Sequence, residues 1–164
     1  MNRISQLAAT LLLLGVIPTT DAARPGKISK VLPHWLDLQG RHTLSPSLLE
    51  RDAYQAKLRA DRSLCSGIRF DVKWSKNTSG ILKLQLELRV TGKAKPIVRE
   101  QAIKPGRRSG WDAVTLDGDA FKAIGKIIAW RVRLLDDDIE LAERRSFLWT
   151  EHKPTGNAEK PASD

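Results

Sequence analysis

The sequence predicts a mostly β fold: an antiparallel β-sandwich of the immunoglobulin or fibronectin type, with six to seven strands and one short N-terminal helix. Two observations carry this prediction. Apolar and polar residues alternate strictly in several short runs, as in strands with one buried face. Turn-forming residues separate these runs at fairly regular intervals. The cysteine pair of true immunoglobulin domains is absent, so the likeness is architectural, and a small barrel is the main alternative.

Residues 68–90 are predicted to form a β-hairpin on which the rest of the chain packs. In residues 68–74 and again in residues 82–90, every second side chain is apolar. The polar segment between them contains Asn77 and Gly80, which tolerate the backbone angles of a tight turn. Such a hairpin has one apolar face that other strands must cover.

The N-terminus has the layout of a secretory signal peptide over residues 1–22. Arg3 precedes an apolar run over residues 7–17, and small residues stand before a cleavage site after Ala22. The alternative is an uncleaved membrane anchor, but the run is shorter than the roughly 20 residues of a spanning helix. We therefore expect an exported protein, periplasmic or extracellular, with no transmembrane segment in the mature chain.

The remaining chain has the size of one domain and, like the whole chain, a net charge of +9. Residues 23–29 are expected to be a flexible leader, residues 30–149 a single β-sandwich domain and residues 150–164 a disordered tail. Cys65 is the only cysteine, so no internal disulfide can form and the core must hold the fold unaided.

The first predicted elements are a strand and a helix. Residues 30–38 are a strand that Pro33 confines to a sheet edge or a bulge. A helix is predicted from Ser47 to about Ala60, because Ser47 and Glu50 fit a capping box. The apolar stripe expected to pack this helix consists of Leu49, Ala53, Ala56 and Ala60, with Tyr54 and Leu58 beside it.

The second half of the chain is predicted to be strands joined by turns. A basic loop over residues 104–110 follows the strand predicted at 97–103. Arg131 and Arg133 are expected to point outward from the strand predicted at 127–135. The expected elements are a weak edge strand over 97–103, a short strand over 111–116, a helical turn over 120–124, a strong strand over 127–135 and a last strand over 139–149.

Several stretches of the chain carry a resemblance to a known family. These stretches are Leu36 to His42, Ser45 to Leu48, Arg51 to Gln55, Ser66 to Val72 and Ser146 to Trp149. Together they resemble a family of small exported bacterial proteins, over most of the mature chain. The resemblance implies export from a bacterial cell, and it brings no catalytic or binding residues with it.

Catalytic and metal-binding patterns are weak. His42 with Ser45 and Asp52 suggests a hydrolase, but no glycine-flanked turn exposes a serine nucleophile. His34 and His42 do not have the spacing of metal ligands. No cofactor motif is present, and no metal site is predicted.

Aspartates near two turns resemble the ligands of a calcium site. Asp117 and Asp119 precede the strand over 127–135, and residues 136–138 follow it. The two groups should therefore lie at opposite ends of the sandwich and act as turn formers instead.

The five tryptophans suggest a second function class, a carbohydrate-binding module. Trp74 and Trp130 share the strand face of apolar neighbours and are expected in the core. Trp111 and Trp149 stand at strand ends, where an exposed ring can stack on a sugar.

The basic residues are the most informative feature. If they adjoin, they form a patch that attracts a polyanion; the alternative is a basic surface that only maintains solubility. The candidate binding residues are Lys93, Lys95, Arg99, Lys104, Arg107, Arg108, Arg131, Arg133, Arg144 and Arg145. The sequence thus predicts an exported, non-catalytic binding or structural module whose partner is an anionic envelope polymer or an acidic protein, with nucleic acid not expected. A carbohydrate-binding module and a hydrolase are the alternatives.

Overall fold

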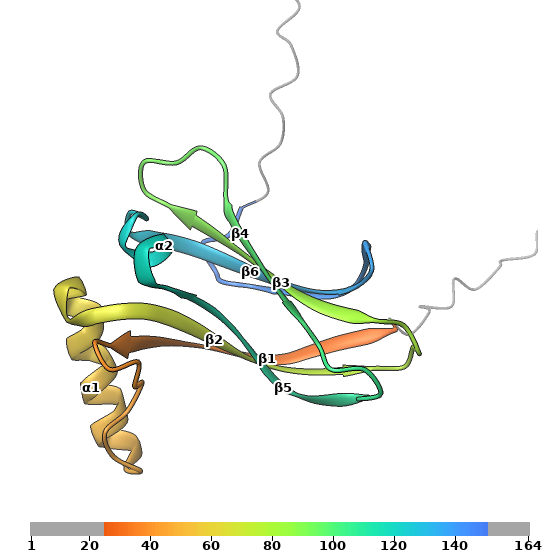
Figure 1. Cartoon of the computed structure of the whole chain (residues 1–164), viewed down its shortest axis with the longest axis horizontal. Helices are drawn as coiled ribbons and strands as arrows, with labels where there is room; N and C mark the ends of the chain where they lie inside the picture. The colour runs from red at the N-terminus through yellow and green to blue at the C-terminus, as the bar shows by residue number, and fades with distance from the viewer. Residues whose placement is uncertain (1–24, 151–164) are drawn as a thin grey trace, which may run out of the picture.

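The computed structural model describes residues 25–150, which form two antiparallel β-sheets lying face to face (Figure 1). The elements, in chain order, are β1 (Gly26–Asp37), α1 (Leu48–Ala60), the 3₁₀ turn η1 (Arg62–Leu64), β2 (Cys65–Lys76), β3 (Leu82–Val90), β4 (Ile97–Ala102), β5 (Ser109–Asp117), α2 (Gly118–Lys122), β6 (Ile127–Asp136) and β7 (Ile139–Arg145). The predicted signal peptide and the tail beyond Thr150 lie outside the described residues.

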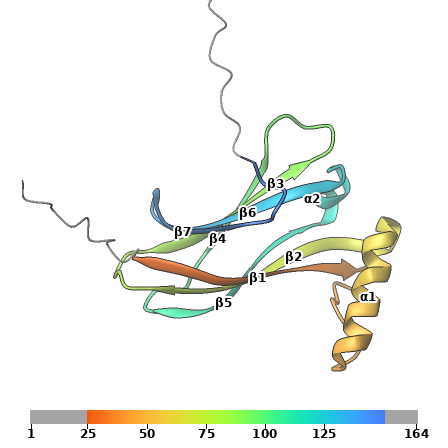
Figure 2. The ribbon, with the colours of Figure 1, turned by 180° about the vertical axis from the view of Figure 1, so that it is seen from behind.

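The seven strands divide into a three-stranded and a four-stranded sheet. The first has the order β1-β2-β5 and the second the order β4-β3-β6-β7, with every neighbouring pair antiparallel. The prediction of a mostly β, antiparallel fold is confirmed. Both sheets are open, so the two layers do not close into a barrel (Figures 1 and 2).

The predicted hairpin is wrong, because β2 and β3 lie in different sheets. The alternation gives each strand one apolar face, as predicted, but it does not say whether two such strands pair side by side or face one another. Here the segment between Lys76 and Leu82 crosses from one layer to the other. Its backbone is tied back toward the start of β1 by a 2.8 Å hydrogen bond from Asn77 N to the carbonyl of Pro25.

The core lies between the facing apolar sides of the two sheets. Phe70 and Val72 of β2, Leu84, Leu86 and Leu88 of β3, and Val132 and Leu134 of β6 are completely inaccessible to solvent. Each such side chain contributes about 1.5–3 kcal/mol of transfer free energy. These residues belong to one contiguous cluster that draws on both layers, which is how a chain without a disulfide holds two sheets together.

β1 is an edge strand, as Pro33 predicts, and it pairs with β2 alone. It begins at Gly26, where Gly26 is opposite Lys76. The expected flexible leader is therefore corrected from Gly26 on, because residues 26–28 pair with β2 and Ser29 lies at an irregularity within the same strand. The sequence pattern indicates a strand only where apolar and polar residues begin to alternate. The backbone pairing with β2 begins earlier, in a segment without a clear pattern.

The helix α1 is present over the predicted residues, but its predicted packing face is only partly right. Tyr54 and Leu58 pack against the core as expected, whereas the predicted stripe is exposed at all four of its positions, Leu49, Ala53, Ala56 and Ala60. Leu49 is 80% exposed, whereas Gln55 and Leu58 are the buried residues of the helix. The Gln55 amide fixes the helix to the end of β1: Oε1 accepts from Trp35 N at 2.8 Å, and Nε2 donates to the carbonyls of Trp35 and His42 at 2.9 and 2.7 Å. The spacing of apolar residues does not indicate a helix face whose main contact is made by a polar side chain such as Gln55.

The predicted capping box is also absent. Ser47 occupies the N-cap position, but its side chain makes no capping hydrogen bond. Ser47→Ala should therefore change the free energy of unfolding by less than about 0.5 kcal/mol, instead of the ~1 kcal/mol typical of a lost N-cap. Urea unfolding of the variant beside the unchanged chain measures this. A loss of 1 kcal/mol or more would show that the hydroxyl caps the helix in solution.

The last strand ends earlier than predicted. β7 stops at Arg145, and Ser146 then holds the chain against β6 through two hydrogen bonds to the backbone of Trp130. Beyond this point the chain turns over the outer face of the four-stranded sheet, where Trp149 becomes buried. The strand over 127–135 is confirmed as β6.

Candidate functional site

Half of the predicted basic patch is engaged with other groups of the protein. Arg131 and Arg133 point outward from β6, as predicted, but both contact Glu87 of the neighbouring strand β3, at 3.0 and 2.6 Å. Arg145 lies 3.8 Å from Glu143 on its own strand. The charges on the outer face of the four-stranded sheet therefore largely compensate one another.

Two further predicted residues have structural contacts. The Arg107 guanidinium binds both carboxylate oxygens of Asp112, at 2.9 and 2.8 Å, and lies over the Trp74 ring. Trp74 Nε1 donates to the same carboxylate at 2.8 Å. Arg144 donates to the carbonyl of Ser29 and so ties β7 to β1 across the two sheets.

The other five predicted residues form no ion pair within the part of the chain that the structure describes. Lys93 and Lys95 lie in the loop before β4, whereas Lys104 and Arg108 lie in the loop after it. Arg99 lies in β4 itself. A six-residue strand is roughly 20 Å long, so the four loop residues form two separate basic groups: Lys93 with Lys95 before β4, and Lys104 with Arg108 after it.

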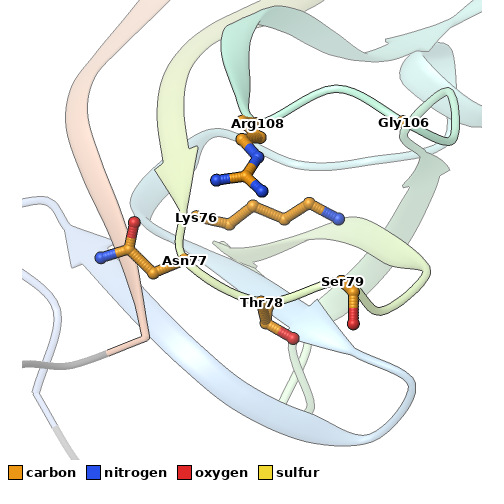
Figure 3. Close-up of a pocket in the computed structure, with 6 residues that line it drawn as sticks. All are labelled: Lys76, Asn77, Thr78, Ser79, Gly106 and Arg108. Carbon is orange, nitrogen blue, oxygen red and sulfur yellow. The ribbon is translucent and has the colours of Figure 1, made fainter.

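A pocket of about 370 Å³ adjoins the second group (Figure 3). It lies between the segment that follows β2 and the loop that precedes β5. The lining residues are Lys76, Asn77, Thr78, Ser79, Gly106 and Arg108. Two cations and no acidic side chain line this space, which we call the basic pocket. Figure 3 shows the Arg108 guanidinium directly above the side chain of Lys76.

Lys76 is the lining residue that sequence reasoning missed. It continues the inward-facing positions of β2 after Trp74, so its side chain lies at the mouth of the core and is only 9% exposed. Its ammonium donates to the carbonyl of Gly80 at 2.7 Å. The sequence did indicate this position. A lysine two residues after Trp74, at the end of a strand, is on the same face as the apolar residues and so has its charge at the rim of the core.

Hydrogen bonds hold the two loops that form the walls of the basic pocket. Lys76 N donates to the carbonyl of Arg108 at 2.8 Å, which joins the two loops directly. Thr78 Oγ1 donates to Asp136 at 3.1 Å, and a Cβ at Gly80 would lie 1.9 Å from the same carboxylate. A larger residue at this position would therefore displace the Asp136 carboxylate. The cations can therefore receive an anion without large rearrangement of the backbone.

His34 and His42 form a separate cluster on the outer face of the three-stranded sheet. The rings of His34 and His42 lie 5.0 Å apart, and His34 Nε2 is 3.5 Å from Asp71. Burial lowers the pKa of both imidazoles. His42 Nδ1 lies 3.5 Å from Arg69, whereas Ser45 Oγ accepts from the backbone of Ser47. Among the described residues no hydrogen bond joins His42 to Ser45.

The described residues hold no group of three or more His, Cys, Asp or Glu side chains arranged to bind a metal ion. Asp117 and Asp119 lie beside α2, at the start of β6, and Asp136 lies at the opposite end of that strand. The two aspartate groups are separated as the sequence predicted. Cys65 is buried, and burial raises the pKa of its thiol.

The exposure of the tryptophans differs from the prediction at one position, Trp149. Trp111 is 45% exposed on β5, as expected for a strand end. Trp149 is only 6% exposed, because the guanidinium groups of Arg89 and Arg131 lie 4.5 and 4.9 Å from the centre of its ring. The expectation that Trp149 is exposed is therefore wrong. Trp74 lies in the core as predicted, and Trp130 is partly buried against it.

No protein-family model matches this chain, and no curated protein is similar to it. The resemblance to small exported bacterial proteins therefore remains a prediction. Between residues 25 and 150, no helix combines the length and the apolar character needed to cross a bilayer.

Proposed function

We propose that the protein is an exported, non-catalytic binding module whose basic pocket receives an anionic group of its partner. The observation that carries this proposal is the pairing of Lys76 and Arg108 around a pocket without an acidic lining residue. Lys104, exposed in the adjoining loop, adds a third positive charge. Buried or preoriented cations of this kind favour phosphate, sulfate or carboxylate groups.

The order of the strands supports the assignment to immunoglobulin- or fibronectin-like folds. If the seven strands are lettered A to G, the sheets are A-B-E and D-C-F-G. Immunoglobulin constant domains have the sheets A-B-E-D and C-F-G, so the fourth strand alone is placed differently. This architecture occurs in many binding and structural modules, and it carries function in loops such as those around the basic pocket.

The partner that fits best is a polymer bearing repeated anionic groups. The pocket is small and polar, and single exposed charge pairs contribute only about 0.2–1 kcal/mol each. Useful affinity therefore requires several contacts along one chain. For an exported protein, envelope polymers are the accessible source of such groups, and an acidic protein surface is the other.

Dextran sulfate and unmodified dextran form a matched pair of probes. The chain should bind dextran sulfate with an affinity that falls as salt rises, and it should bind dextran much more weakly. Arg108→Glu combined with Lys104→Glu should lower the affinity about tenfold, because two attractions become repulsions. Isothermal titration at two salt concentrations measures both effects.

The matched control is Lys93→Glu combined with Lys95→Glu, which changes the net charge equally at the other end of β4. An equal loss in this control would show that net charge alone attracts the polymer, and the basic pocket would then have no special role. Dextran binding as tight as dextran sulfate binding would instead favour the second candidate function, a carbohydrate-binding module. The exposed ring of Trp111 is the observation that supports that candidate.

A further inference from the structure

A second surface feature lies on the open side of the two layers, between β1 and β6. An apolar pocket of about 350 Å³ is present there. Its lining comprises Pro33, Trp35, Ile68, Phe70, Ile127, Ile128, Trp130, Ser146, Phe147 and Leu148. Ile128, Leu148 and Phe147 are 48%, 61% and 100% exposed. Contiguous exposed apolar side chains are typical of interaction and ligand-binding sites.

The pocket exists because β7 is short. Its pairing with β6 ends where Arg131 is opposite Arg145, so Ile127 and Ile128 have no neighbouring residue in β7. In the other layer, β1 is an edge strand with the half-buried Trp35 facing the same space. The side of the sandwich is therefore uncovered at this point, although it is closed at the other end, where Arg144 contacts Ser29.

A second pocket, of about 510 Å³, continues the first and shares Trp35 and Ile127 with it. Its remaining lining residues are Arg59, Ala60, Arg62 and Lys126. The two pockets together, which we call the apolar groove, are thus apolar over most of their length and basic at one end. No acidic side chain lines either of them.

The basic end of the apolar groove has one fixed and two exposed cations. Arg62 donates to the carbonyl of Gly125 at 2.7 Å and to that of Phe121, and its guanidinium lies 4.4 Å from the centre of the Phe121 ring. Arg59 and Lys126 are exposed beside it. Positive charge is therefore held at this end whatever conformation the exposed side chains adopt.

We propose that the apolar groove binds a single-chain amphiphile, an alkyl chain with an anionic head group such as a carboxylate. The alkyl chain covers Trp35, Ile127 and Trp130, and the head group meets Arg59 and Lys126. Charge complementarity selects this occupant, since the cations stand at one end only. A peptide fits less well, because its backbone N–H and C=O groups would face carbon-rich side chains that offer few hydrogen-bond partners.

Decanoate, used below the concentration at which it aggregates, is the probe. It should bind one molecule per chain and change the tryptophan fluorescence, because Trp35 and Trp130 line the groove. Decyltrimethylammonium, with the same chain and the opposite charge, should bind at least tenfold more weakly. Isothermal titration gives the stoichiometry and both affinities.

Two kinds of variant separate the head-group and chain contacts. Arg59→Glu combined with Lys126→Glu should weaken decanoate binding about tenfold and leave the binding of the neutral decanol unchanged. Ile128→Asp should abolish the binding of all three compounds. The matched control, Ile139→Asp, changes the first residue of β7, an isoleucine that is 71% exposed and opposite Asp136 at the far end of β6, and it should have no effect.

Three results would overturn the proposal: equal affinity for decanoate and decyltrimethylammonium, binding only to phospholipid vesicles, or an equal loss in Ile128→Asp and Ile139→Asp. Binding to vesicles alone would identify a membrane-facing surface instead of a groove for single chains. Arg108→Glu with Lys104→Glu should leave decanoate binding intact, so this test and that of the proposed function can fail separately.

Discussion

Replacing Asp37 by asparagine is expected to lower the free energy of unfolding by about 3 kcal/mol. The carboxylate stands at the end of β1, only 4% exposed, and accepts four hydrogen bonds. One oxygen accepts from the backbone N–H groups of Gln39 and Arg41, at 2.9 and 2.8 Å. The other accepts from Arg41 Nε at 2.8 Å and from the Tyr54 hydroxyl at 2.7 Å. An amide places a donor against Arg41, so at least two of these bonds are weakened.

The loss should also depend on pH. Burial by itself raises the pKa of Asp37, but the hydrogen bonds from Tyr54, Arg41 and Gln39 outweigh it and lower the pKa from 3.8 to about 2. A carboxyl with a lowered folded-state pKa stabilises the fold above its unfolded pKa, and this stabilisation is lost as the pH falls toward the folded value. The difference between the unchanged chain and Asp37→Asn should therefore shrink between pH 4 and pH 2.

Urea unfolding at a series of pH values tests both parts of this prediction. Asp52→Asn on α1 is the matched control, since Asp52 is exposed, and it should change the stability by less than about 0.5 kcal/mol. Tyr54→Phe removes a single bond to Asp37 and should give an intermediate loss. A difference that stays constant from pH 7 to pH 2 would contradict the role assigned to the ionised carboxylate.

The individual strands could be predicted from the sequence because burial of one face imposes a period of two. This is why β3 and β6 were expected where they lie, and why Pro33 placed β1 at an edge. The partners of each strand could not be predicted in the same way. Pairing depends on contacts between residues far apart in the chain, and the apolar faces of β2 and β3 suit a hairpin and two facing layers equally well.

The candidate sites were also predictable only in part. The basic residues near the pocket were visible as a run of charge, and Trp111 as a ring at a strand end. The neutralisation of Arg131 and Arg133 was not visible, because Glu87 precedes them by more than forty residues and becomes their neighbour only through the register of β3 against β6. The apolar groove likewise depends on where β7 ends, which no local pattern near Arg145 indicates.

Glu87 gives the second large expected effect. Its side chain is 7% exposed and contacts Arg131 and Arg133 together. Glu87→Gln keeps the size of the side chain but leaves two partly buried guanidinium groups without their shared charge. We expect a loss of about 2–3 kcal/mol, below the 3–5 kcal/mol typical of a fully buried pair, since the two arginine side chains are 18% and 28% exposed.

Glu100→Gln is the matched control for this substitution, because Glu100 lies on the same sheet but is 44% exposed and pairs with Lys83 at 3.4 Å. An exposed pair contributes about 0–1 kcal/mol, and high salt should reduce that further. Arg131 also covers the Trp149 ring, so Glu87→Gln should increase the quenching of tryptophan fluorescence by iodide, whereas Glu100→Gln should not. Equal losses in the two variants would mean that the contacts of Glu87 are screened by solvent like those of any surface pair, and that the outer face of the sheet is held by its backbone ladder alone.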